Sequence, residues 1–225
     1  LWPRAYRVDS KVDKDPVDRA RDTALRSVLE SNRGNLVRST ELALEALPLL
    51  PASEAELRGP LNTNLGIAYW SVGRFEQAEA LLWEGYRDAT KAGIPYVAMT
   101  ALTLLAETSR SHGDLSRALE LNEQALGLAP GSPACAGAHS GLANVLYERN
   151  ELEAASAHCT IGLDLNRLVG EPLTHDLLRV QSMLIATALG DEARVRQAIE
   201  QLDQFVGGPV DRHSTSVQAM PRIRL

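Results

Sequence analysis

Residues that break helices recur at nearly constant intervals along this 225-residue chain, and no other feature constrains its fold as strongly. Glycine, and less often asparagine, takes the left-handed backbone conformation that ends a helix. Five such residues stand 39, 40, 37 and 40 positions apart: Gly34, Gly73, Gly113, Asn150 and Gly190. Because each lies between two stretches with apolar residues at helical spacing, each predicts the turn of a helical hairpin.

A second series of residues, all prolines, marks the junctions between hairpins. They stand 35, 38, 39 and 37 positions apart: Pro60, Pro95, Pro133, Pro172 and Pro209. Proline is accepted at a helix start because the N–H that it lacks would have no partner there. Each proline therefore predicts where a hairpin opens. Chance could place one such pair of breakers, but five in register indicate a tandem repeat.

Small residues keep a constant phase between the breakers. One set lies seven positions before its breaker and another lies five positions after it: Gly66, Ala106 and Ala143; Ala78, Ala118 and Ala155. Small side chains at these positions let two antiparallel helices approach closely. A single hairpin cannot bury its apolar face alone, so neighbouring hairpins must stack to cover it.

These patterns predict an all-α fold, a right-handed α-solenoid of about five antiparallel hairpins with a period of 37–40 residues. The solenoid domain is expected to span residues 16–206. Residues 1–15 are expected to be a lead-in segment, and residues 207–225 a tail that looks like a truncated sixth hairpin.

Composition limits the classes of partner. The net charge is −6 with no basic stripe, so direct contact with nucleic acid by this segment is not expected. No apolar run approaches the 18 or so residues of a membrane span. The two cysteines, Cys135 and Cys159, have neither a disulfide framework nor a zinc spacing, which fits a reducing compartment and predicts a cytoplasmic protein.

The small and aromatic positions of the repeat resemble those of the tetratricopeptide repeat (TPR): Gly66, Tyr69 and Ala78; Ala118, Ala125 and Pro130. The period is several residues longer than the 34 of that family. With the stretches GLANVLYERNELEAASAH and GDLSRALELNEQAL, it is similar to the superhelical domain of MalT-like, large LuxR-type transcriptional regulators of bacteria. The resemblance covers about residues 20–206. It implies a domain that receives an inducer or a partner protein, between an NTPase module and a helix-turn-helix.

No residues predict a catalytic site, a metal site or a cofactor. The five histidines lack the HExxH spacing of a zinc enzyme. His158 and Cys159 are adjacent, so on a helix they point about 100° apart and do not form a nucleophile–base pair. Cys159 falls in the packing phase and is expected to be a small buried hydrophobe. His112 is expected at a helix C-terminus, where the dipole favours a partly charged imidazole.

The first helix of each hairpin is expected to line the concave side, as in other arrays of this kind. The phase that faces the groove holds six candidate binding residues: Trp70, Glu107, Arg110, Asn144, Tyr147 and Glu148. An aromatic ring, a guanidinium and several amide or carboxylate groups could stack a ring and fix the polar atoms of a ligand. Alternatively, Glu107 and Arg110 form an i,i+3 surface pair, while the aromatic rings pack between repeats. Carbohydrate, peptide or no ligand at all remain open.

Two functions follow from these residues. The first is a ligand- or partner-sensing regulatory domain of a bacterial transcriptional regulator, which binds a protein, a peptide or a small-molecule effector in the groove. The second is a generic TPR protein–protein interaction scaffold with no tie to transcription. An NTPase before this segment and a helix-turn-helix after it, in the full-length gene, would favour the first. An enzyme would need a converging set of titratable groups that the spacing does not supply.

Overall fold

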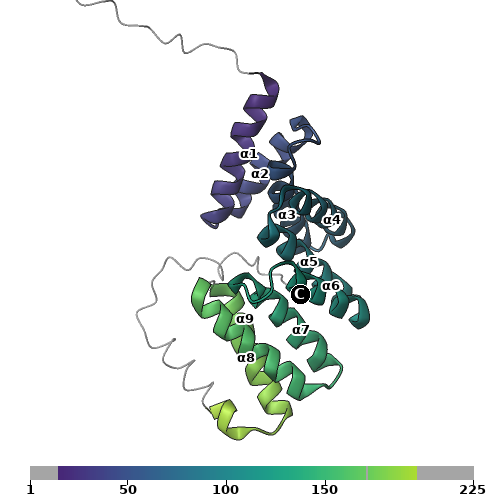
Figure 1. The fold of residues 1–225 in the computed structure, drawn as a ribbon, viewed down its shortest axis with the longest axis vertical. Helices are drawn as coiled ribbons and strands as arrows, with labels where there is room; N and C mark the ends of the chain where they lie inside the picture. Colours follow the sequence, from purple (N-terminus) through teal and green to yellow (C-terminus); the bar gives the residue numbers. More distant parts are fainter. Residues whose placement is uncertain (1–14, 171, 197–225) are drawn as a thin grey trace, which may run out of the picture.

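The computed structural model describes residues 15–170 and 172–196, and Figure 1 shows the helices following one another in chain order along the long axis. Two short 3₁₀ turns, η1 and η2, interrupt the α-helices. In order, the elements are α1 (Pro16–Asn32), α2 (Leu36–Ala46), η1 (Leu47–Leu49), α3 (Ala55–Ser71), α4 (Phe75–Ala92), α5 (Pro95–Ser111), α6 (Leu115–Leu128), η2 (Pro133–Cys135), α7 (Ala136–Glu148), α8 (Leu152–Val169) and α9 (Pro172–Ala188).

All five predicted turns have the left-handed backbone that the sequence indicates. The φ of Asn150 is 59°, and the φ of the four glycines lies between 70° and 82°. The amide after each breaker donates to a carbonyl five residues earlier, at 2.8 to 2.9 Å: Asn35 to Glu30, Arg74 to Tyr69, Asp114 to Ser109, Glu151 to Leu146 and Asp191 to Ala186. This bond closes the end of a first helix and reverses the chain. The same local chemistry therefore builds every hairpin.

The prolines are less uniform than predicted. Pro95 and Pro172 begin α5 and α9, but Pro133 begins the 3₁₀ turn η2. Pro60 does not open the second hairpin, because α3 starts at Ala55 and runs through it. The first turn of α3 is held by tertiary contacts, since the side chain of Arg58 donates to the carbonyl of Leu50 at 3.1 Å. The helix thus starts before Pro60 and tolerates the loss of one backbone hydrogen bond.

Close approach between helices explains the phase of the small residues. Ala78, Ala118 and Ala155 are completely buried. A Cβ at Gly66 would lie 2.7 Å from the side chain of Leu82, and a Cβ at Gly59 would lie 2.9 Å from the backbone nitrogen of Ala89. Side chains at these glycines would therefore push α3 away from α4.

The array is a solenoid rather than a globule around one core. Three buried apolar clusters succeed one another, the first from α1 to α3, the second from α4 to α7 and the third from α7 to α9. Each first helix packs on the first helix of the next hairpin, from α1 to α3, α5, α7 and α9. The array bends, so α1 at one end and α9 at the other lie on the same side of α3–α6 (Figure 1). The expectation of an all-α solenoid is confirmed.

The described residues include four complete hairpins and the first helix of a fifth, α9. Helical residues resume at 192–196, where the side chain of Asp191 accepts from the amide of Arg194 at 3.1 Å. The predicted lead-in, apart from Asp15, and the predicted tail lie outside the described residues. Within 15–170 and 172–196, no helix is both long and apolar enough to cross a membrane.

Replacing Gly59 with Ala tests the close approach of α3 and α4. The Cβ would meet the backbone of Ala89 at 2.9 Å, so the variant should lose about 1–3 kcal/mol in free energy of unfolding. The matched control is Gly127→Ala in α6, where a Cβ meets nothing within 4 Å. This control should gain up to about 1 kcal/mol from helix propensity. Urea denaturation followed by circular dichroism measures both, and equal midpoints for the two variants would contradict the contact.

Candidate functional site

The first helices carry a row of side chains at equivalent positions, here called the inner stripe because the sequence predicts that it lines the concave side. Its members lie 13, 10, 6 and 3 positions before each breaker, a spacing that keeps one face of a helix. In α5 the inner stripe is Thr100, Thr103, Glu107 and Arg110; in α7 it is Gly137, Ser140, Asn144 and Tyr147; in α9 it is Leu177, Val180, Leu184 and Thr187. Five of the six predicted binding residues belong to this row, and Glu148 directly follows it.

Three of the predicted residues form a charged cluster at the centre of the inner stripe. Arg110 Nε donates to Glu107 Oε2 at 2.8 Å, and its two terminal nitrogens pair with Glu107 and with Glu148. The hydrogen bond with Glu107 raises the pKa of Arg110, so the guanidinium stays charged. The side chains of Glu107 and Arg110 are only 27% and 24% exposed. Because Glu148 belongs to α7, the cluster links the third hairpin to the fourth.

The other predicted residues make none of the ion pairs of this cluster. Trp70 packs edge-on against Phe75, with ring centroids 6.2 Å apart, and Phe75 packs in the same way against His112 at 6.1 Å. This row of rings joins the second hairpin to the third. Asn144 is half-buried, and Tyr147 is 36% exposed on α7. The structure thus gathers the charged candidates, whereas the ring of Trp70 takes part in packing.

An apolar patch at the end of the inner stripe was not predicted as a site. Leu177, Val180 and Leu184 of α9 are 49%, 47% and 47% exposed, although they stand at the i, i+3, i+7 spacing of a packing face. The sequence pattern of an exposed apolar face is the same as that of a buried one, so it did not indicate this patch. With these residues, the inner stripe changes from polar on α5 and α7 to apolar on α9.

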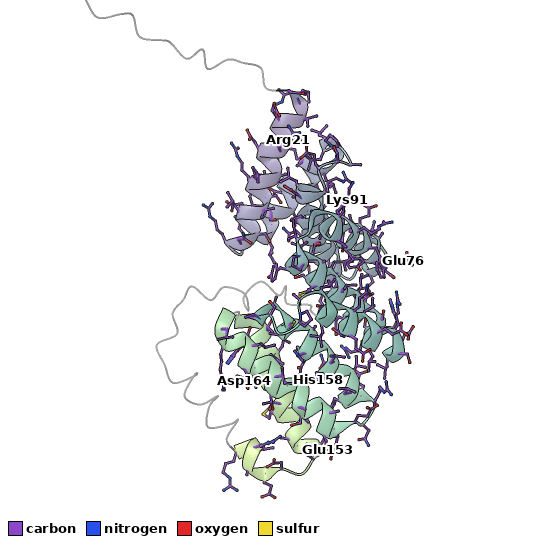
Figure 2. All side chains as sticks on the ribbon, viewed as in Figure 1. Arg21, Glu76, Lys91, Glu153, His158 and Asp164 are labelled. Carbon is purple, nitrogen blue, oxygen red and sulfur yellow. The ribbon has the colours of Figure 1, made fainter. Side chains whose placement is uncertain are left out.

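A second titratable cluster, missed at the sequence level, lies inside the fourth hairpin. His139 Nδ1 and His158 Nδ1 are 2.9 Å apart, which requires one ring to donate and the other to accept. Burial lowers the pKa of both histidines. The nearby His158 lowers the pKa of His139 further, whereas the carboxylate of Glu123 partly offsets the lowering at His158. Figure 2 places His158 among α7, α8 and α9. Only the repeat register, which sets these residues on facing helices, could have indicated the pair.

Cys159 is not an activated nucleophile. It is 1% exposed, and burial raises the pKa of its thiol to about 12. The neighbouring His158 turns its ring to His139 instead. The interpretation of Cys159 as a small buried hydrophobe is confirmed. Among the described residues, no group of three or more histidine, cysteine and acidic side chains could hold a metal ion.

Comparison with known families assigns the repeat. The family described as the MalT-like TPR region matches residues 21–225. The chain belongs to this family. The MalT-like resemblance found in the sequence is thereby confirmed, and this chain is a TPR-like helical repeat domain of the kind that serves as a protein-interaction scaffold.

Solved structures share the fold at low sequence identity. BtubC (BKLC) from P. vanneervenii is 18% identical with a TM-score of 0.64, over 86% of this chain and 89% of that one. Aspartyl phosphate phosphatase F from Bacillus subtilis is 15% identical with a TM-score of 0.64, over 85% and 51%. A putative kinesin light chain with TPR-like repeats from Podosopora anserina is 17% identical with a TM-score of 0.57, over 85% and 96%. No curated protein matches this MalT-like domain significantly.

The histidine pair should make stability depend on pH. Because the folded state lowers the pKa of both rings, it binds protons less readily than the unfolded chain does. The stability that the neutral pair contributes is present above the unfolded pKa of about 6.5 and is lost as pH falls from there towards the folded values. Urea midpoints should therefore decrease between about pH 7.5 and 5.

Single-residue variants separate this pair from the remaining titratable groups. His139→Gln should flatten the decrease in midpoint, because it removes one of the two rings whose pKa is lowered by folding. The matched control is His175→Gln in α9, whose imidazole is 38% exposed. A pH profile that His139→Gln and His175→Gln change equally would show that the pair does not control stability.

Proposed function

We propose that this MalT-like domain senses an effector or a partner along its inner stripe, as a regulatory domain of a bacterial transcriptional regulator in the cytoplasm. The observation that carries the proposal is that equivalent positions of successive first helices hold a charged cluster on α5 and α7 and an exposed apolar patch on α9. Membership of the MalT-like family supports the regulatory role. Two buried free thiols, Cys135 and Cys159, are compatible with a reducing compartment.

Binding at the Arg110 cluster can change the curvature of the array. Arg110 bridges Glu107 on its own helix to Glu148 on the next hairpin. A ligand that takes hydrogen bonds from Arg110, or that contacts Glu148, changes the link between two hairpins. A partly exposed ion pair contributes only about 1 kcal/mol or less, so a ligand can outcompete it. Binding would then favour one curvature of the array, and neighbouring modules would read that population shift.

The inner stripe favours an occupant with both polar and apolar parts. Asn144 and Tyr147 add an amide and a phenol beside the charged cluster, and both are at least partly accessible. Leu177 and Val180 offer apolar surface one hairpin further on. A peptide or protein segment can place polar groups at the charged cluster and apolar groups on α9. A small effector fits at the charged cluster alone. In both cases the role is binding, and we propose no catalysis.

A generic interaction scaffold is the second candidate, favoured by solved structures that share this fold at only 15–18% identity. The complete polypeptide distinguishes the two. An NTPase module before this domain and a helix-turn-helix after it support the regulator, and a chain without them supports the scaffold.

Screening small sugars and peptides by thermal shift tests the groove, with affinities then measured by calorimetry. For a compound that binds, Arg110→Ala or Tyr147→Ala should lower the affinity at least about tenfold, as expected for losing a charged or aromatic contact. The control is Arg167→Ala on α8, which removes another i,i+3 pair, to Asp164, from a side chain that is 71% exposed. Unchanged affinity in both test variants would show that the inner stripe does not bind the compound.

A further inference from the structure

A crevice of about 270 Å³ lies between the second and third hairpins, away from the inner stripe. It is bounded by α4, α5 and α6, near the turn at Gly113. Its apolar walls come from Trp83, Leu105 and Leu121. The other lining residues are polar: Glu79, Thr108, Ser109, His112, Asp114 and Arg117. An apolar floor with a few converging polar groups is the usual composition of a small-molecule site, and this volume is just below the usual range.

A small residue at one position of the repeat leaves room for the crevice. Ser109 lies four positions before its breaker, where the second and fourth hairpins have Tyr69 and Leu146. Both of those side chains are larger than that of Ser109. The fifth hairpin has the small Ala186 at this position, and Ala186 also lines a pocket, with Gly190 and Val195. The crevice is therefore not a general consequence of stacking TPR-like hairpins.

Two carboxylates at the crevice have unused capacity. Among the described residues, Glu79 has no ion-pair or hydrogen-bond partner, and it lies exposed at the rim on α4. Asp114 uses Oδ1 to accept from the amide of Arg117 at 2.9 Å, which leaves Oδ2 for another donor. Both groups are suited to an ammonium.

One cation complements these acids. The guanidinium of Arg117 lies over the ring of Trp83, 5.7 Å from its centroid, and Nη1 pairs with Glu120 Oε2 at 3.2 Å. A guanidinium has five N–H donors in a planar fork, so it can also take a carboxylate side-on. Its contact with Trp83 holds it beside the apolar wall. The crevice thus offers acidic and basic groups around one apolar space.

We propose that this crevice binds a free α-amino acid with an apolar or aromatic side chain. The ammonium lies between Glu79 and Asp114, the carboxylate is held by Arg117, and the side chain packs on Trp83, Leu105 and Leu121. A ligand with an ammonium and a carboxylate can contact both the acids and Arg117, whereas a plain amine contacts only the acids and a plain acid only Arg117.

This site is separate from the proposed groove. At 100° per residue, Leu105, Thr108 and Ser109 lie on the side of α5 opposite to Glu107 and Arg110. The crevice touches α5 and α6 of the third hairpin and α4 of the second, while the Arg110 cluster links the third hairpin to the fourth. An amino acid bound in the crevice can stabilise one junction without contact with a groove ligand.

Isothermal titration calorimetry on the full chain tests the proposal with L-leucine, L-methionine, L-phenylalanine and L-tryptophan. At least one should bind with a dissociation constant of about 1 mM or tighter, the weak end of specific small-ligand affinity. The N-acetyl derivative lacks the ammonium and the amide derivative lacks the carboxylate, so each should bind at least about tenfold more weakly. If no free amino acid binds, or if the amide binds as well as the acid, the proposal is wrong.

Variants locate the binding. Ser109→Leu fills the crevice with the residue that the fourth hairpin has in register, and should weaken binding at least about tenfold, whereas Ser109→Ala should retain it. Glu79→Gln, on the exposed rim, should also weaken binding about tenfold without affecting the fold. Arg110→Ala should leave amino-acid binding unchanged. Full binding by both Ser109→Leu and Glu79→Gln would overturn the assignment, and it would not affect the proposal for the inner stripe.

Discussion

The contact on which the structure depends is the close approach of paired helices over residues with little or no side chain. Where α3 meets α4, a Cβ at Gly85 would lie 2.4 Å from Thr63 Oγ1, and one at Gly66 would lie 2.7 Å from Leu82. Buried alanines at the matching phase in later hairpins repeat this fit. This close contact over small residues is here called the seam. Because packing inside proteins is dense, helices this close cannot slide or rotate freely, so the seam fixes the geometry of each hairpin.

With the seam turned inward in each hairpin, other faces of the helices are left for recognition. The outer helices carry charged side chains such as Glu76, which lies at the outer edge of the array in Figure 2. The first helices carry the inner stripe, whose character changes from one hairpin to the next. The seam is repetitive because every hairpin must close, whereas the free faces vary because they do not carry the fold. Both of the proposed sites in this MalT-like domain therefore depend on residues that break the repeat, Ser109 in one and Arg110 in the other.

Polar links between hairpins include one buried pair, Ser140 of α7 with Gln181 of α9, and several contacts nearer the surface. Arg58 joins the first two hairpins through the carbonyl of Leu50, Gln124 donates to the phenol of Tyr86 at 2.8 Å between the second and third, and Arg110 reaches Glu148 beyond them. Each such contact adds only about 1 kcal/mol. Stacked hairpins with weak polar links can change curvature at modest cost, which is the property that a sensing domain needs.

The sequence alone determined the helices, the turns and the seam, because a left-handed turn, a helix end and a close helix contact each require particular residue types within a short stretch. It also indicated that Glu107, Arg110 and Glu148 share the inner side. It failed at Pro60, since tertiary contacts of Arg58 begin α3 five residues earlier. Only the tertiary structure decided that Arg110 bridges two hairpins, that His139 faces His158 and that Ser109 leaves a crevice beside Trp83. Those features depend on how separate hairpins come together, and residue spacing within one hairpin does not contain that information.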